Sequence, residues 1–160
     1  MTIYLVRHAQ AGTRHDWSGD DLTRPLTREG RRQAADLVDM LGEVQLDQIL
    51  TSPFLRCIET VAPLAARRSG DGLCIKVHAS LAEGPALDAI ALVRSFGSEE
   101  INAVLCSHGD IIPGVLDALV REDGLDLGPA AKCQKGSTWM IDTTKGSDRF
   151  SNALYLPPPR

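Results

Sequence analysis

The sequence predicts a three-layer α/β/α fold with a mostly parallel central sheet of about six strands and helices on both faces. Short β-branched and apolar runs alternate along the chain with amphipathic segments of helical period. This alternation indicates βαβ units, whose helical crossovers cover both faces of a parallel sheet. The 160 residues contain no internal repeat, low-complexity tract or linker. We therefore expect a single domain over residues 1–160.

The first quarter of the chain contains one strand, one long loop and one helix. The β-branched and apolar run Thr2–Arg7 predicts the first strand. The polar segment Ala9–Pro25 is long for a connection in a compact domain, and such loops are often functional. Thr27 is a good N-cap, and the apolar residues that follow at helical spacing predict a helix that ends at Gly42.

The rest of the chain continues the alternation. We expect further strands at Leu46–Thr51, Leu73–His78, Asn102–Cys106, Ser137–Asp142 and Ser151–Leu156. A second helix is expected to have Ser52 as its N-cap and Pro53 at its first helical position. A weaker helix is expected at Pro85–Phe96, and the apolar spacing within Ile112–Leu119 predicts another. The last two strands are expected to form a hairpin.

Composition argues against several classes of function. The formal net charge is -4 and aromatic residues make up 4% of the chain, which argues against a nucleic-acid partner. No apolar run approaches the ~20 residues that span a bilayer, so no membrane contact is expected. The N-terminus lacks the features of a signal peptide. The four widely spaced cysteines are therefore expected to be free thiols, and the protein is expected to be cytoplasmic.

Reactive side chains follow the ends of the predicted strands, which is where ligands bind in open α/β sheets. Arg7 and His8 follow the first strand, and Arg56 lies one turn into the helix after the second. Glu83 comes after the third strand, and His108 comes directly after the fourth. Each residue alone would usually be structural or solvated. We expect the five to converge on one edge of the sheet, where their combination points to chemistry.

This set of residues is suited to phosphoryl transfer, in which catalysis is mostly positioning and charge stabilisation. Arg7 and Arg56 can bind the phosphoryl oxygens through their planar guanidinium groups. A neutral His8 can attack phosphorus, and cationic neighbours are expected to keep it neutral. His108 can donate to a phosphoryl oxygen. Glu83 can protonate the leaving oxygen and then deprotonate the attacking water, so no metal or cofactor is expected.

The sequence lacks the motifs that are typical of other catalytic and metal sites. Zinc-ligand side chains are present, but no pair has the spacing of a structural zinc site. There is no G-x-S-x-G elbow of a serine hydrolase and no P-loop. Cys57 lies beside Arg56, but the C-x-x-x-x-x-R cradle of a cysteine phosphatase is missing.

With these motifs the sequence resembles the histidine phosphatase superfamily, the phosphoglycerate-mutase-like group. The resemblance rests on LVRHAQAG at 5–12, RPLTREG at 24–30, LTSPFLRCIET at 50–60 and LCSHGD at 105–110. The short length and the R-P-L-T segment are similar to SixA-like phosphohistidine phosphatases. Residues 11–34 also resemble the histidine-phosphatase domain that follows a Nudix domain in some bacterial nucleotide-pool hydrolases. No Nudix box is visible in this sequence.

The resemblance implies a role for each residue at the predicted edge. His8 matches the phosphorylated histidine, and Arg7, Arg56 and His108 match the rest of the phosphate pocket. Glu83 is the best match to the acid/base carboxylate. Two positions depart from the common pattern: Ala9 replaces a glycine, and Gln10 stands where many of these phosphatases have an acidic residue.

Several residues of the loop 9–25 can either contact the substrate or have a structural role. Arg14 and Arg24 can reach a second phosphate or a leaving group of the substrate. Alternatively, Asp20 or Asp21 pairs with Arg24 and holds the loop in place. Trp17 in this loop is suited either to stacking on a base or to packing.

Together these observations predict a metal-independent phosphohydrolase that acts through a phosphohistidine on His8. Its substrate is expected to be a phosphohistidine protein, a nucleotide or another small phosphomonoester. One alternative is a catalytically weak phosphate-ester-binding or regulatory module, since a fold does not guarantee activity. A second is a phosphomutase, although mutases of this family are usually longer. Nothing in the sequence specifies an oligomeric state.

Overall fold

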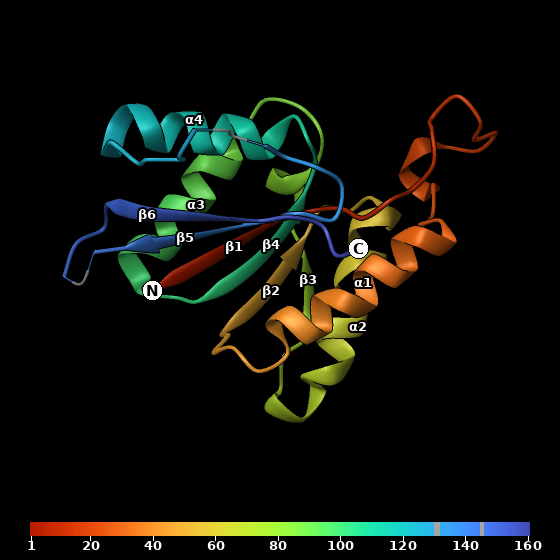
Figure 1. The fold of residues 1–160 in the computed structure, drawn as a ribbon, viewed down its shortest axis with the longest axis horizontal. Helices are drawn as coiled ribbons and strands as arrows, with labels where there is room; N and C mark the ends of the chain where they lie inside the picture. The colour runs from red at the N-terminus through yellow and green to blue at the C-terminus, as the bar shows by residue number, and fades with distance from the viewer. Residues whose placement is uncertain (130–131, 145) are drawn as a thin grey trace.

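The computed structural model describes residues 1–129, 132–144 and 146–160. One six-stranded sheet forms its centre, with the strand order β3-β2-β4-β1-β5-β6 (Figure 1). The strands are β1 (Thr2–Arg7), β2 (Gln48–Thr51), β3 (Ile75–Val77), β4 (Ala103–Ser107), β5 (Thr138–Thr143) and β6 (Phe150–Leu156). The helices are α1 (Arg28–Leu41), α2 (Leu55–Arg67), α3 (Leu87–Glu99) and α4 (Ile111–Asp123).

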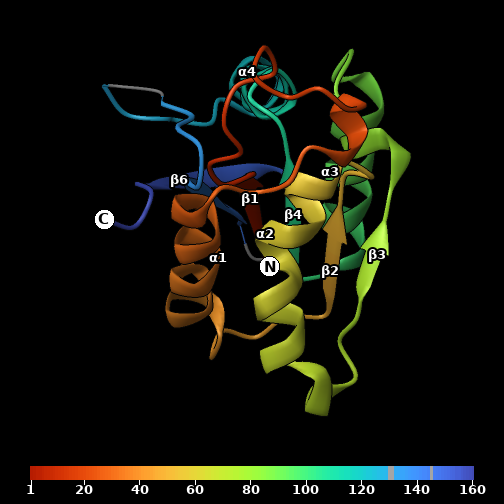
Figure 2. The ribbon, with the colours of Figure 1, turned by 90° about the vertical axis from the view of Figure 1, so that its right-hand side faces the viewer.

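The helices form two layers around the sheet. Helices α1 and α2 cover one face, and α3 and α4 cover the other (Figures 1 and 2). Alternate residues of β1 divide between the two cores, because successive strand side chains point to opposite faces. Tyr4 and Val6 pack with the α1 and α2 side, whereas Ile3 and Leu5 pack with the α3 and α4 side. The expected three-layer α/β/α fold is confirmed.

The sheet is mixed. Strands β1, β2, β3 and β4 are mutually parallel, whereas β5 pairs antiparallel with β1 and β6 pairs antiparallel with β5. The expected closing hairpin is therefore present, and the expectation of a mostly parallel sheet holds for its four-stranded part. The carboxyl ends of these four strands share one edge, and the loop that follows β1 passes over this edge (Figure 2).

Local sequence signals explain the bounds of α1. The Thr27 side chain accepts a hydrogen bond from the Gly30 amide at 3.1 Å, as expected of an N-cap, and Gly42 ends the helix. The expected start of the next helix is wrong by two residues. Helix α2 begins at Leu55 with Phe54 as its N-cap residue, because the Ser52 hydroxyl contacts the His108 ring at 2.8 Å. No helix in the described ranges is long and apolar enough to cross a membrane.

Candidate active site

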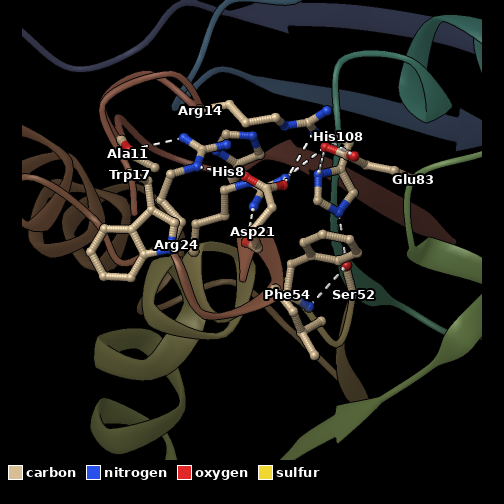
Figure 3. A network of polar contacts seen from close by, with 12 residues as sticks. His8, Ala11, Arg14, Trp17, Asp21, Arg24, Ser52, Phe54, Glu83 and His108 are labelled. Atoms are coloured by element: carbon tan, nitrogen blue, oxygen red, sulfur yellow. Dashed lines mark hydrogen bonds and ion pairs between the residues drawn. The ribbon is translucent and has the colours of Figure 1, made fainter. Parts of the chain in front are cut away.

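Four of the expected site residues come together at the carboxyl edge of the sheet, and Figure 3 labels His8 and His108 among them. Arg7 ends β1 and His8 follows it, Arg56 lies in the first turn of α2, and His108 follows β4. The pairing of β1 with β4 brings the two histidines together, since the His8 amide donates to the Ser107 carbonyl at 3.0 Å. The ring centroids of His8 and His108 are 5.4 Å apart.

The His8 imidazole is buried and oriented by its neighbour. Only 4% of His8 is exposed, and its Nδ1 lies 2.8 Å from the Ala9 carbonyl oxygen. A carbonyl only accepts hydrogen bonds, so Nδ1 carries the proton and Nε2 keeps its lone pair. Burial lowers the His8 pKa from 6.5 to about 3, with smaller contributions from the charges of Arg56, His108 and Arg7. Desolvation is thus a larger cause of neutrality than the cationic neighbours that the sequence suggested.

Arg7 occupies space that only a glycine leaves open. A Cβ at Gly109 would lie 2.6 Å from the Arg7 Cζ, so the S-H-G motif needs its glycine to admit the guanidinium group. Arg7 Nη1 donates to the Cys133 carbonyl, and its buried Nε has no hydrogen-bond partner among the described residues. Part of this guanidinium group is therefore available to an oxyanion.

Arg56 is fully buried and lies at the centre of an ion-pair network. Its Nη2 lies 2.6 Å from Glu83 Oε1 and 3.2 Å from Asp21 Oδ2, and its Nη1 donates to the Asp21 carbonyl at 3.0 Å. The guanidinium carbon lies 4.6 Å from the centroid of the Phe54 ring. These contacts fix the group in one orientation, which a buried cation requires to offset its desolvation.

One ring nitrogen of His108 contacts Ser52 and the other faces Glu83. The Phe54 amide donates to Ser52 Oγ, and this oxygen lies 2.8 Å from His108 Nε2. In the tautomer in which the Ser52 hydroxyl donates to Nε2, the ring proton is on Nδ1. Nδ1 has no hydrogen-bond partner in the described part of the chain and lies 3.5 Å from Glu83 Oε1. Cys57 is fully buried and lies 3.6 Å from Nε2, the ring nitrogen opposite this free donor.

Glu83 joins this group from the segment after β3. Its Oε1 contacts Arg56, and its Oε2 accepts a hydrogen bond from Arg14 at 2.8 Å. The side chain is 31% exposed, so it lies between the buried arginine and solvent. All five residues expected at the strand ends are thus in one cluster.

The long loop is held by a partly buried ion pair. Arg24 Nε donates to Asp21 Oδ1 at 2.8 Å, and Arg24 Nη1 donates to the carbonyls of Ala11 and Gly12. Burial would raise the Asp21 pKa, but the hydrogen bond from Arg24 and the charges of three arginines outweigh it, so the pKa lies below its usual value. Of the two interpretations of Arg24, the structure favours the one in which an aspartate pairs with it.

Arg14 and Trp17 differ in how firmly they are held. The Arg14 side chain is 63% exposed and also pairs with Asp21 at 3.2 Å. Trp17 is half-buried, and its indole donates to the Asp20 carbonyl at 2.9 Å, which fits a packing residue. Sequence reasoning missed that Asp21 also binds Arg56. The only sequence signal for it was its spacing three residues before Arg24.

No side chain in the described ranges suggests a metal centre. The described residues contain no group of three or more histidine, cysteine, aspartate or glutamate side chains placed to hold a metal ion. The four cysteines are free thiols, as expected.

Fold and sequence together define the class of protein. The model of the histidine phosphatase superfamily (branch 1) matches residues 3–88, and the chain belongs to this superfamily. It is 32% identical over 166 residues to the 8-oxo-(d)GTP phosphatase of Mycolicibacterium smegmatis. This match covers 99% of the chain and 48% of the relative, so the chain spans about half the length of that protein.

Solved structures share the fold at low sequence identity. The protein histidine phosphatase SixA, in complex with tungstate, superimposes with a TM-score of 0.69 at 20% identity, covering 98% of this chain and 94% of that chain. A mycobacterial glucosyl-3-phosphoglycerate phosphatase, in complex with VO3, has a TM-score of 0.73 at 18% identity, with 96% of each chain covered. The superfamily assignment suggested by the motifs is confirmed.

Proposed function

We propose that the chain is a phosphatase that hydrolyses phosphate esters through a phosphohistidine on His8. The observation that carries this proposal is the state of the His8 ring. Its Nδ1 proton is bound by the Ala9 carbonyl and its pKa is lowered to about 3, which leaves a neutral Nε2 as a nucleophile at physiological pH.

Hydrogen-bond donors without a partner near His8 support the proposal that an oxyanion binds there. Arg7 Nε, Arg56 Nε and His108 Nδ1 are buried without a hydrogen-bond partner in the described ranges. Each unsatisfied buried donor of this kind costs about 1–3 kcal/mol of stability. A phosphoryl group offers three charged oxygens and matches donors of this kind. We infer that these three residues bind the phosphoryl group while His8 attacks it.

The proposed reaction has two steps. In the first, the His8 Nε2 lone pair forms a bond to phosphorus, and the bond from phosphorus to the leaving oxygen breaks. Glu83, once it has left Arg56 and taken up a proton from solvent, gives that proton to the leaving oxygen. In the second, a water loses a proton to Glu83 and attacks phosphorus, and the electrons of the N–P bond return to Nε2. Arg7, Arg56 and His108 stabilise the charge on the phosphoryl oxygens in both steps.

Substrate binding would rearrange the ion pairs of Glu83. The phosphoryl group and the Glu83 carboxylate both need Arg56, so a bound phosphoryl group competes with the contact at 2.6 Å. Glu83 is partly exposed and can move toward solvent, the side on which a leaving group would depart. We propose that this exchange places Glu83 beside the leaving oxygen.

Relatives support hydrolysis without fixing the substrate. The Mycolicibacterium relative is a phosphatase of 8-oxo-(d)GTP, and SixA is a protein histidine phosphatase. A phosphorylated small molecule or a phosphohistidine protein therefore remains the proposed partner. The arrangement of His8 as a free nucleophile argues for turnover rather than for a binding module alone.

The test is hydrolysis of p-nitrophenyl phosphate by the purified chain in EDTA. We expect turnover by the wild type and a loss of about 10³-fold or more in His8→Ala, because the nucleophile is removed. His15→Ala is the matched control, since His15 is an exposed histidine of the loop, and it should keep the wild-type rate. Normal turnover by His8→Ala would overturn the mechanism, and phosphate binding without turnover would favour the binding module.

A further inference from the structure

Lys135 lies in the turn before β5, next in sequence to a residue that is bonded to the backbone of His8. The amide of Gly136 donates to the carbonyl oxygens of His8 at 3.0 Å and Arg7 at 3.1 Å, so the turn is bonded to the end of β1. Figure 2 shows the segment that leads into β5 next to the loop that follows β1. The Lys135 ammonium group reaches this loop, where its Nζ lies 3.5 Å from the Gly12 carbonyl oxygen.

Lys135 is a cation placed among other cations. Arg24 Nη1 binds the same Gly12 carbonyl at 3.2 Å, so the two positive groups converge on one oxygen. Burial lowers the pKa of Lys135, and the charges of Arg7, Arg24 and Arg56 lower it further. Arg24 has Asp21 as its partner, but no carboxylate of the described residues lies within 4.0 Å of Lys135 Nζ.

Arg14 adds a second cation at the opening of the site. Arg14 pairs with Asp21 and Glu83, and the buried Arg56 pairs with the same two carboxylates. Each of these carboxylates therefore bridges the two arginines. The Arg14 side chain is 63% exposed, unlike the buried Arg24, and is therefore free to follow a ligand.

A single phosphoryl group leaves these cations only partly neutralised. It would satisfy Arg7, Arg56 and His108 at His8, as proposed above, but Lys135 would still lack an anionic partner. A site lined by charges of one sign attracts a ligand of the opposite sign, and lysine is suited to phosphate as a point charge. The unmatched charge therefore indicates a further anionic group on the substrate.

We propose that Lys135, assisted by Arg14, binds a second phosphate group of the substrate, so that the preferred substrates are di- or polyphosphate compounds. This inference rests on the proposed function, because it assumes that the first phosphate lies at His8. It makes Lys135 a residue that determines specificity. Isolated phosphomonoesters and phosphohistidine side chains, which carry one phosphate, would bind less well.

Equilibrium binding tests this proposal without requiring turnover. Dissociation constants of inorganic phosphate and inorganic tripolyphosphate are measured by calorimetry on the wild type, Lys135→Ala and Lys132→Ala. Lys132 is an exposed lysine three residues earlier and serves as the matched control for the loss of one positive charge. Lys135→Arg tests whether a cation at this position is sufficient.

We expect tripolyphosphate to bind the wild type at least tenfold more tightly than phosphate. Lys135→Ala should reduce this ratio about tenfold, which is typical for the loss of one charge-assisted contact, whereas Lys132→Ala and Lys135→Arg should preserve it. An unchanged ratio in Lys135→Ala, or equal weakening of both ligands, would overturn the proposal. Turnover of p-nitrophenyl phosphate is scored separately, so a failure of the proposed catalytic function is distinguishable from a failure of this subsite.

Discussion

The Nη2 atom of Arg56 lies 2.6 Å from Oε1 of Glu83, which joins a fully buried guanidinium group to the carboxylate that we propose as acid and base. The ligand-free site therefore holds an anion next to the arginine that a phosphoryl group needs. In the proposed mechanism, binding of the substrate and movement of Glu83 are linked through this one contact. The pair would then let the same small site bind phosphate and deliver a proton.

Replacement of Glu83 by glutamine should slow hydrolysis mainly for poor leaving groups. The amide of the new side chain would have no proton to give to an alkoxide, whereas p-nitrophenolate departs without protonation. We expect kcat/KM for an alkyl phosphate, which reports the first step, to fall by about 10²–10⁴-fold in Glu83→Gln, and kcat/KM for p-nitrophenyl phosphate to fall much less. A plot of log kcat/KM against leaving-group pKa measures this. Equal effects on every ester would assign the acid role to another residue.

Replacement of Gly109 by alanine should impair phosphate binding. The added Cβ would lie 2.6 Å from the Arg7 Cζ, so the guanidinium group must shift from its present position. We expect KM for p-nitrophenyl phosphate to rise and kcat to fall, together by about tenfold or more in kcat/KM. Gly70→Ala is the control, because nothing lies within 4 Å of its added Cβ. Wild-type kinetics in Gly109→Ala would show that the position of Arg7 is unimportant.

Replacement of Asp21 by asparagine should loosen the long loop. Arg24 and Arg56 would lose a shared carboxylate, and Arg24 would remain buried without its ion pair. We expect the free energy of unfolding to fall by about 1–3 kcal/mol, measured by chemical denaturation. Asp16→Asn removes a carboxylate from an exposed part of the same loop and should change stability by less than about 0.5 kcal/mol. Equal stability of the two variants would contradict this role of Asp21.

Acid should destabilise the fold through His8. Its pKa is lowered from 6.5 to about 3 by folding, so the unfolded chain binds the additional proton between these pH values. The contribution of His8 to stability is complete above pH 6.5. It is lost on acidification at up to about 1.4 kcal/mol per pH unit until about pH 3.

Denaturation at a series of pH values, compared between the wild type and His8→Asn, isolates this contribution. The wild type should lose stability faster on acidification, and the difference between the two proteins should be constant above pH 7. His15→Asn should follow the wild type, since His15 is exposed. A wild-type advantage that does not depend on pH would contradict the burial of a neutral imidazole.

The sequence was sufficient to predict that the proposed phosphate-binding residues converge. The run Thr2–Arg7 has the strand bounds that were expected, and parallel strands end at one edge, so Arg7, His8 and His108 had to converge. These predictions depend on local propensity and on a general rule of sheet topology.

Residues with long-range partners were harder to predict. Ser52 has the side chain and the following proline of an N-cap, but its hydroxyl contacts His108 instead, and α2 starts at Leu55. The distance between Asp21 and Arg56 depends on how the loop folds over the sheet, which periodicity does not encode. Lys135 carried no motif, and the role that we propose for it follows only from its neighbours in space.

Trapping of the phosphorylated protein tests the central claim most directly. The wild type is mixed with excess p-nitrophenyl phosphate, quenched within milliseconds in alkali, digested and analysed by mass spectrometry, because a phosphohistidine survives base and is lost in acid. We expect one phosphoryl group on the peptide that contains His8, formed and consumed at rates that match turnover. Steady hydrolysis with no phosphorylated His8 at any time, or with the phosphoryl group on another residue, would contradict this claim.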